Sequence, residues 1–320
     1  MLIFSLDPDD ALAPALAADL DRTLAPLEER VFADGEIKLR PLADPRGADA
    51  YVVASLHGGP QLSPHDRLCR LLLFAAALRQ NGAARVSAVV PYLAYARKDR
   101  QTKPFDPLSL RWLAQVTEAS GVDQAIVLEA HNVAAFQNAF RCPTIHLDAH
   151  PAFEALAHEL AATGPLSVAS PDPGGVKRAQ LWREALQESL GRSVGFAVVD
   201  KRRSGGLVSG GRIVAGEVAG STVLLYDDLI ASGETMQRAA QALRHAGARS
   251  VVACAAHGLF VDPAAQVLAD AAIDRVAVTD SVPPFRLAGA GAALHDKLTT
   301  VSAVPLFARA LRSSHEGWRR

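Results

Sequence analysis

The stretch "LLYDDLIASGETMQRAAQAL" (residues 224–243) decides the fold class, because it contains the end of one strand, a short turn and the start of one helix. An apolar run typical of a buried strand ends in Asp227 and Asp228, and a turn of small residues precedes the helical pattern. Unpaired carboxylates are costly to bury. This strand end should therefore meet water, a metal or a ligand rich in hydroxyl groups.

The same strand-to-helix pattern recurs along most of the chain. Helices are expected over residues 107–119, 175–190 and 234–246, and the first and last of these are followed by "SG" or "AG" stops. Several predicted strands are continuous apolar runs, as in strands buried on both faces of a parallel sheet. The predicted strands are residues 86–92, 124–130, 166–172, 195–201, 221–228, 249–258 and 274–280. This alternation predicts an α/β protein.

The pattern also occurs in two halves of the chain. The segments "EASGVDQAIVLEAH" and "RHAGARSVVACAAHG" both join a helix, a glycine stop, a strand and a polar strand end. Two similar domains are therefore expected, an N-terminal one over residues 1–148 and a C-terminal one over residues 149–320. The boundary is placed at "LDAHPAF", and it is left open that the last helix packs back on the first domain.

Composition excludes several classes of protein. The chain has 320 residues, a formal net charge of −1 and 49% hydrophobic residues, so global disorder is not expected and no broad basic field favours nucleic acid. Local basic segments suit a small anionic ligand better. The three cysteines are far apart, which argues against a disulfide framework or zinc site and for reduced thiols in a cytoplasmic protein. The start of the chain turns acidic at Asp7, unlike a signal peptide, and no run is long enough to span a membrane.

Polar residues cluster at the carboxyl ends of the predicted strands, where open parallel sheets bind ligands. After Asp228, the backbone N–H groups of residues 232–235, the hydroxyls of Ser232 and Thr235 and the helix N-terminus could together bind an anion. The predicted ligand is a sugar phosphate, with its ribose on the aspartates. The alternative is that Ser232 only caps its helix while the aspartates are solvated. The local sequence leaves both open.

This turn resembles the phosphoribosyl-diphosphate loop of the type I phosphoribosyltransferase superfamily. It departs from common versions at Ala231 and Glu234. The other strand ends narrow the resemblance to the ribose-phosphate diphosphokinase family, whose motifs occur here in the expected order: "FADGEI" (32–37), "PYLAYARKDR" (91–100), "DPLSL" (106–110), "EAHN" (129–132), "SPDPGGVKRA" (170–179), "DKRR" (200–203), "VTDSVP" (278–283) and "VSAVPLFARAL" (301–311).

The resemblance implies two tandem phosphoribosyltransferase-like domains, each with a mainly parallel sheet flanked by helices. It implies transfer of the diphosphoryl group of ATP to the 1-hydroxyl of ribose 5-phosphate, which gives 5-phosphoribosyl 1-diphosphate and AMP for nucleotide biosynthesis. Lys201 and Arg203 would be the catalytic pair, on a mobile glycine-rich loop over residues 204–211. Ser204 stands where the family has proline. A solvated basic turn is the alternative for these residues.

The resemblance also implies ligands for both substrates. Phe32, Asp34 and Glu36 would form the adenine site near a subunit interface of a homo-oligomer, with a core position as the alternative for Phe32. Lys98 would contact the ATP phosphates or pair with Asp99. The ATP-binding residues implied are Phe32, Asp34, Glu36, Arg97, Lys98 and Asp99. The residues implied for ribose 5-phosphate are Asp227, Asp228, Ala231, Ser232, Gly233, Glu234 and Thr235.

Magnesium is the implied cofactor, with His131 and Asp172 as its ligands. Glu129 stands where the family usually has aspartate, and its longer side chain could serve a metal directly or through water. Two other functions are left open. An ordinary phosphoribosyltransferase would use the same sugar-phosphate loop, and a non-catalytic regulatory subunit would share the fold but is expected to lose parts of the catalytic or metal set.

Overall fold

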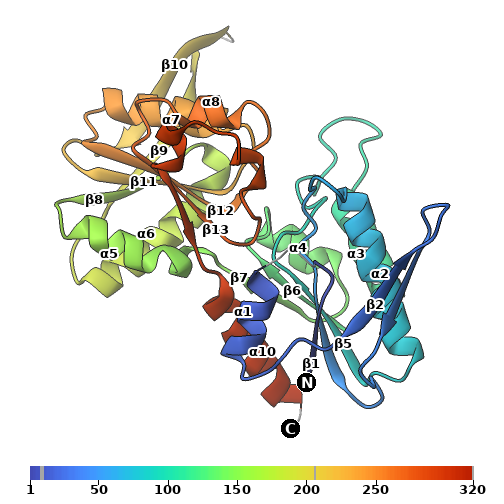
Figure 1. Ribbon diagram of the computed structural model, residues 1–320. Helices are drawn as coiled ribbons and strands as arrows, with labels where there is room; N and C mark the ends of the chain where they lie inside the picture. Colours follow the sequence, from blue (N-terminus) through green and yellow to red (C-terminus); the bar gives the residue numbers. More distant parts are fainter. Residues whose placement is uncertain (8–10, 205–206, 319–320) are drawn as a thin grey trace. The chain divides into compact units, whose positions relative to one another are not determined.

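The protein is described by a computed structural model that covers residues 1–7, 11–204 and 207–318, without the side chains of residues 201–212 and 293. The chain divides into two compact units (Figure 1). Unit 1 contains residues 1–148 together with 303–320, and unit 2 contains residues 149–302. The first division therefore falls between Asp148 and Ala149, and the C-terminal segment belongs to unit 1.

Unit 1 is built on a five-stranded sheet in the order β1-β4-β5-β6-β7, in which every neighbouring pair is parallel. Its strands are β1 (Leu2–Ser5), β4 (Asp49–Val53), β5 (Arg85–Val90), β6 (Gln124–Leu128) and β7 (Thr144–Leu147). A separate antiparallel pair consists of β2 (Leu27–Val31) and β3 (Ile37–Pro41). The helices are α1 (Leu12–Asp19), α2 (Pro64–Gln80), α3 (Ser109–Ala119), α4 (Val133–Ala139) and α10 (Val304–Trp318).

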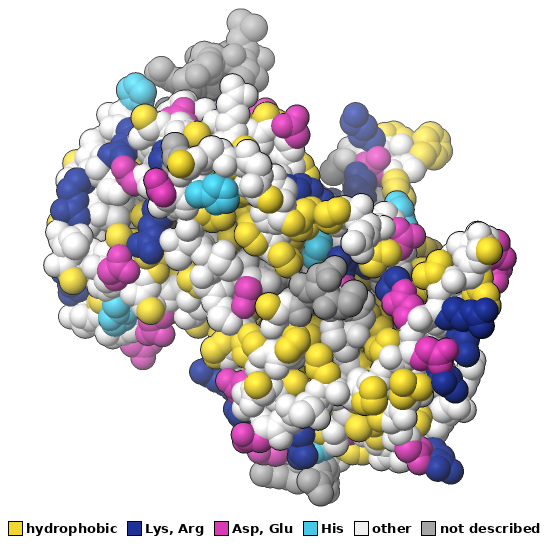
Figure 2. Space-filling model, viewed as in Figure 1, with side chains coloured by type: hydrophobic (Ala, Val, Ile, Leu, Met, Phe, Trp, Pro, Cys, Tyr) yellow, Lys and Arg dark blue, Asp and Glu magenta, His cyan; other side chains and the backbone are white. Residues whose placement is uncertain are grey.

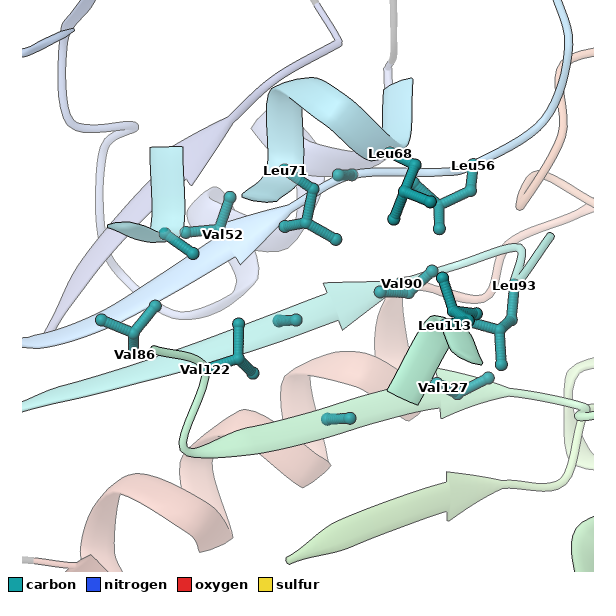
Figure 3. Packing of buried hydrophobic residues seen from close by; sticks show 14 of the residues in the cluster. Val52, Leu56, Leu68, Leu71, Val86, Val90, Leu93, Leu113, Val122 and Val127 are labelled. Atoms are coloured by element: carbon teal, nitrogen blue, oxygen red, sulfur yellow. The ribbon is translucent and has the colours of Figure 1, made fainter. Parts of the chain in front are cut away.

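Alternate residues of these strands face opposite sides of the sheet. On one side, a single apolar cluster includes Val52 with Leu71 of α2 and Val127 with Leu113 of α3, as Figure 3 shows. On the other side, the Tyr51 hydroxyl lies against Arg85, whose guanidinium also donates to the Ser314 carbonyl of α10 at 3.2 Å. Because both faces are covered by helices, these strands read as continuous apolar runs in the sequence.

Helix α2 begins where the sequence provides a cap. Ser63 accepts from the Asp66 backbone N–H, the Asp66 side chain accepts from the Ser63 N–H, and Pro64 occupies the first turn. Such a capping box satisfies two N–H groups that have no partner within the helix, and a cap of this kind contributes about 1 kcal/mol.

Helix α10 is fixed to unit 1 through a buried carboxylate. Asp49 accepts from Arg85 Nε at 2.7 Å and contacts His315 Nδ1 at 2.6 Å. Burial raises the pKa of Asp49, but hydrogen bonds from Arg85 and His315 outweigh this and the net pKa is lowered. Arg85 also lies over the ring of Trp318, with 5.3 Å from its central carbon to the ring centroid. The last helix is thus bound to the first unit by charge as well as by packing.

Unit 2 is built on a seven-stranded sheet in the order β10-β9-β8-β11-β12-β13-β14. Only the β10–β9 pair is antiparallel. The strands are β8 (Leu166–Ser170), β9 (Gly195–Ser204), β10 (Leu207–Gly216), β11 (Thr222–Ile230), β12 (Ser250–Gly258), β13 (Arg275–Thr279) and β14 (Leu298–Val301). The helices are α5 (Glu154–Ala161), α6 (Val176–Leu190), α7 (Glu234–His245), α8 (Ala264–Leu268) and α9 (Ala292–His295), with short 3-10 turns η1 (His150–Phe153), η2 (Pro173–Gly175) and η3 (Phe285–Leu287).

The two faces of this sheet have different cores. On one face, Val223 and Leu225 of β11 pack in a cluster with Met236 and Leu243 of α7. On the other face, Trp182 of α6 meets Tyr226 of β11 edge to face, with ring centroids 4.7 Å apart. Strand β11 is therefore central and buried on both faces, and this explains the apolar run that precedes Asp227.

The structure confirms the predicted α/β class and the predicted helices 107–119, 175–190 and 234–246 to within about two residues, the usual uncertainty of helix ends. A mobile glycine-rich loop was expected over residues 204–211, and the structure describes the backbone around residues 205–206 as a strand pair. The backbone of β9 continues to Ser204 and pairs with β10, and the register shifts between Val208 and Arg212. Such a shift lets a strand pair accommodate extra residues, here a run containing Gly210 and Gly211.

Charged side chains of both signs are interspersed on the face shown in Figure 2, in agreement with the net charge of −1. Among the helices in the described part of the chain, none combines the length and the apolar character that crossing a bilayer requires. The cysteines are free thiols, with Cys69 exposed, Cys142 half-buried and Cys254 buried.

Candidate active site

Asp227 and Asp228 lie near the carboxyl end of the central strand β11, and the turn to α7 follows directly. Asp228 is only 4% exposed, and its backbone N–H donates to Asp227 Oδ1 at 2.9 Å. The sheet therefore fixes both carboxyl groups at the edge where parallel sheets bind ligands.

No side chain of the described residues caps the start of α7. Its N-cap residue is Gly233, in the left-handed region at φ 80° and ψ −11°, and no side-chain hydrogen bond caps the helix. The alternative that Ser232 caps the helix is therefore wrong. A Cβ at Gly233 would lie 2.9 Å from Leu268 Cδ2, so glycine is required here for space as well as for conformation. The first N–H groups of α7 are left for an anion.

The remaining residues of this turn border the helix start. Ala231, Ser232 and Thr235 are half-buried, and Glu234 is exposed. Glu234 Oε2 accepts from Arg238 at 2.9 Å, an exposed pair one helical turn apart. The carboxylate of Glu234 is thus engaged along the helix, where an acidic group in the first turn suits the helix dipole.

Arg178 completes this group, and the sequence reasoning missed it. Its Nη1 lies 3.4 Å from Asp227 Oδ1 and 3.7 Å from Asp228 Oδ1, and its side chain is 14% exposed. It lies in the first turn of α6, within the motif "SPDPGGVKRA". The sequence could have indicated Arg178, because two adjacent carboxylates at a buried strand end need a nearby cation.

Burial raises the pKa of Asp227 well above its usual range, the adjacent Asp228 carboxylate raises it further, and Arg178 lowers it by less. The folded protein therefore keeps a proton on Asp227 at pH values where the unfolded chain has lost it.

We expect Asp227→Asn to make the protein more stable at neutral pH. Below the ordinary pKa of 3.8, Asp227 is protonated in both states and contributes nothing to pH dependence. Above it, the unfolded chain ionises first, and the free energy of unfolding falls by about 1.4 kcal/mol per pH unit until the raised pKa is reached. Asparagine does not ionise, so the variant lacks this fall and at pH 8 gains about 1.4 kcal/mol for each unit by which folding raises the pKa of Asp227. Denaturant unfolding at pH 5 and pH 8 checks this, and parallel stability curves for the two proteins would contradict it.

The loop after β8 positions Asp172. Its Oδ1 accepts from the backbone N–H groups of Gly174 and Gly175, at 2.8 and 3.2 Å. A Cβ at Gly175 would lie 2.8 Å from Ser170 Oγ, so this close turn needs glycine. No recorded hydrogen bond from the described residues reaches Asp172 Oδ2. A carboxylate that is oriented through one oxygen and offers the other fits a divalent cation.

Lys201 and Arg203, the predicted catalytic pair, have side chains outside the described residues. The backbone of Lys201 pairs with Arg212, and that of Arg203 pairs with Val208. The structure thus places both positions on β9, in the strand pair that continues from the edge of the unit 2 sheet.

In unit 1, the predicted ATP-phosphate segment follows β5. Arg97 is exposed, and Tyr95 has a φ of 64° in the left-handed region. Lys98 Nζ bonds Asp106 and, at 3.1 Å, Thr102 Oγ1. The hydrogen bond from Lys98, followed by that from Thr102, lowers the pKa of Asp106. The expected alternative of a Lys98–Asp99 pair is wrong, because Lys98 is held by a carboxylate eight residues later.

Asp99 has a different partner. Asn132 Nδ2 donates to Asp99 Oδ2 at 2.7 Å, and Asn132 Oδ1 accepts from the Ala135 N–H and so caps α4. One amide thus links the "YARKDR" and "EAHN" segments, which follow the neighbouring strands β5 and β6. The sequence predicted that both segments lie at the carboxyl ends of strands, but it did not indicate the hydrogen bond between Asn132 and Asp99.

Phe32, Asp34 and Glu36 lie at the tip of the β2–β3 hairpin. Phe32 is 38% exposed, with the guanidinium carbon of Arg30 4.9 Å from its ring centroid. The alternative of a core aromatic is therefore wrong. Asp34 Oδ1 accepts from the Glu36 N–H at 3.1 Å and stabilises the turn. No recorded hydrogen bond among the described residues joins this tip to residues 97–99.

After β6, three side chains bring one possible ligand atom each to within 4.8 Å of one another: Glu129, His146 and Asp148. Glu129 is buried, the side chain of His146 is 7% exposed, and Asp148 is about half-exposed. His131, the predicted metal ligand, is exposed nearby in sequence and does not belong to this group.

Comparisons with known proteins agree with this arrangement. Residues 1–121 match the N-terminal domain of ribose phosphate pyrophosphokinase, and residues 211–318 match the phosphoribosyl synthetase-associated domain. The ribose-phosphate pyrophosphokinase of Caldanaerobacter subterraneus subsp. tengcongensis is 33% identical over 316 residues, which are 98% of this chain and 95% of that protein. The protein of the same name from Prochlorococcus marinus is 35% identical over 285 residues, which are 88% of this chain and 82% of that protein.

The crystal structure of phosphoribosylpyrophosphate synthetase from Mycobacterium smegmatis has the same fold, with a TM-score of 0.85 and 32% identity over 99% of both chains. The likeness extends over both units. From these similarities along nearly its whole length, the chain belongs to the ribose-phosphate pyrophosphokinase family.

Proposed function

We propose that this protein transfers the diphosphoryl group of ATP to the 1-hydroxyl of ribose 5-phosphate, which yields 5-phosphoribosyl 1-diphosphate and AMP for nucleotide biosynthesis. The observation that carries this proposal is the end of β11, where two carboxyl groups stand beside an uncapped helix N-terminus. Carboxylates accept hydrogen bonds from sugar hydroxyls, and backbone N–H groups at a helix start bind phosphate.

In the proposed reaction, the 1-hydroxyl oxygen of ribose 5-phosphate attacks the β-phosphorus of ATP. The bond from that phosphorus to the oxygen that joins it to the α-phosphorus breaks. AMP leaves with this oxygen, and the hydroxyl proton is released. Such transfer depends on positioning and on neutralisation of charge rather than on covalent help from the protein. Asp227 and Asp228 would hold the ribose, and the N–H groups of residues 232–235 would hold the 5-phosphate.

Unit 1 would bind ATP. Arg97 is exposed, so its side chain is available to a phosphate. Asp99 follows Arg97 closely in the sequence, and a hydrogen bond from Asn132 holds its side chain. Lys98 would act on this segment indirectly, because its salt bridge to Asp106 closes the loop that follows. Lys201 and Arg203 would neutralise charge that develops on the transferred group.

Magnesium is proposed as cofactor, with His131 and Asp172 as ligands. The fit rests on Asp172, whose Oδ1 is held by two backbone N–H groups while Oδ2 meets no donor recorded among the described residues. When bound with ATP, the ion would neutralise phosphate charge. Asp172 itself is oriented by its turn, and this is the contribution of the chain.

A homo-oligomer and a cytoplasmic location are further parts of the proposal. The hairpin tip with Phe32 is exposed, which suits the proposal that it contributes to the adenine site of a neighbouring subunit. Free thiols at all three cysteines agree with a reducing compartment.

The deciding assay is AMP formation from ATP and ribose 5-phosphate without any nucleobase. We expect turnover on the order of 1–100 s⁻¹, as is typical of kinases. An ordinary phosphoribosyltransferase would give no AMP here and would instead consume 5-phosphoribosyl 1-diphosphate when a nucleobase is supplied. A protein that binds both substrates but forms no AMP would be the non-catalytic subunit.

A further inference from the structure

The chain leaves β6 through a strained residue. Glu129 is 4% exposed and has a φ of 42°, in the left-handed region that residues other than glycine seldom adopt. Its N–H still donates to Leu147 O of β7 at 2.8 Å, so the turn comes directly after this bond. Such a conformation persists only where its surroundings hold it, and strained residues of this kind gather at functional sites.

His146 of β7 holds the turn. The N–H of Ala130, a residue only 2% exposed, donates to His146 Nε2 at 3.1 Å. An imidazole nitrogen accepts a hydrogen bond only when it carries no proton, so the proton of neutral His146 must be on Nδ1. Asp148 Oδ1 lies 3.6 Å from this Nδ1, and its negative charge favours the same tautomer.

This pattern of hydrogen bonds argues against a metal at His146, although Glu129, His146 and Asp148 are close enough to surround one. A ligating imidazole offers one bare nitrogen to the metal and usually donates its other N–H to an acceptor. Here Nε2 faces a donor, the Ala130 N–H. Moving the proton to Nε2 to free Nδ1 would place two N–H groups against each other.

We infer that His146 is a positioning residue, which in its Nδ1–H tautomer fixes the turn at Glu129 and Ala130 and thereby sets the segment that carries His131. Asp148 selects the tautomer. The hydrogen bond from Ala130 to His146 is observed within unit 1 and does not depend on the proposed function. The expected effect on the binding of the cation that accompanies ATP does rest on the proposed function.

The tautomer is tested directly on the full chain by ¹⁵N NMR of histidine side chains, with His146→Gln to assign the signal. We expect His146 Nε2 to show the shift of an unprotonated nitrogen and Nδ1 that of an N–H. Addition of Zn²⁺ alone should leave the Nδ1 signal in place. A protonated Nε2, or Nδ1 displaced by Zn²⁺ as in direct ligation, would overturn the inference.

Two variants test the consequence. His146→Leu removes the acceptor at similar size, whereas His146→Gln can present Oε1 to the Ala130 N–H. We expect His146→Leu to weaken the binding of Mn²⁺ in the presence of ATP by about 10–100-fold, the usual effect of losing a residue that orients metal ligands, and His146→Gln to restore most of it. Paramagnetic resonance of free Mn²⁺ measures this without turnover. His158→Gln, an exposed histidine of α5, is the control and should match the wild type.

The affinity for ribose 5-phosphate should be the same in all these proteins, because its proposed residues lie in unit 2. Equal Mn²⁺ binding by His146→Leu and the wild type would refute the positioning role. If His146→Leu fails to fold, the NMR result on the wild type still decides whether the hydrogen bond is as inferred. A protein that lacks AMP formation but shows the expected tautomer would refute the proposed function and leave the hydrogen bond in place.

Discussion

Arg178→Ala is expected to lower the free energy of unfolding by about 3 kcal/mol and to weaken the binding of ribose 5-phosphate at least about tenfold. The guanidinium is the cation recorded beside both Asp227 and Asp228, and all three side chains are less than one-fifth exposed. Removing one partner from such a group leaves the others buried without compensation. For a unit of this size, the midpoint of thermal unfolding should fall by roughly 6–12 °C.

Binding should suffer for a related reason. The positive charge of Arg178 lowers the pKa of Asp227, so its removal raises that pKa. The carboxyl group then holds its proton more firmly and accepts hydrogen bonds from the sugar less well. Arg178→Lys keeps the charge and should retain most of the stability. Lys177→Ala removes an exposed cation from the same helix turn and serves as the control. Calorimetric titration with ribose 5-phosphate and a thermal melt measure both effects, and an Arg178→Ala protein as stable as Lys177→Ala would refute the role assigned to Arg178.

Lys201→Ala is expected to reduce turnover by about 10²–10³-fold while ATP still binds. A cation that meets charge developing in the transition state contributes to the rate more than to substrate affinity. Lys201 lies on β9, where its backbone pairs with Arg212 in the antiparallel ribbon. Replacement by alanine leaves that backbone pairing intact, so the fold should persist.

Arg202→Ala is the matched control for Lys201→Ala. It removes one positive charge from the same strand at the position between the two proposed catalytic residues. Initial rates of AMP formation, with the Kd for ATP measured separately, distinguish the two variants. Equal and small losses for both would mean that the ribbon acts only through its net charge, and the catalytic assignment of Lys201 would then be wrong.

Much of the fold was predictable from local patterns. The continuous apolar run before Asp227 predicted a strand buried on both faces, and β11 is packed by α7 on one side and by Trp182 on the other. Helices α3 and α7 were predictable in part because glycine stops follow them directly in the sequence. The short strands β1, β4, β7 and β14 were not predicted, since segments of four or five residues are too short for their pattern to distinguish a strand from part of a helix.

The candidate site was predicted less completely. The sequence left open whether Ser232 caps α7, and only the backbone of Gly233 decides this, because its left-handed conformation places it at the N-cap. Lys98 was expected near ATP or Asp99, but it bonds Asp106 across a loop. The glycine-rich run after Arg203 suggested a loop, whereas its backbone on either side of residues 205–206 forms a strand pair.

The sequence by itself determined the α/β class, the order of the polar strand ends and the carboxylates beside a helix start, because each of these depends on residues adjacent in the chain. Only the tertiary structure decided that Arg178 faces Asp227, that His146 accepts from Ala130 and that α10 is fixed to Asp49. These partners are 16 to 266 residues apart in the sequence. Their hydrogen bonds form only after the strands pair and the core closes, and no local pattern records them.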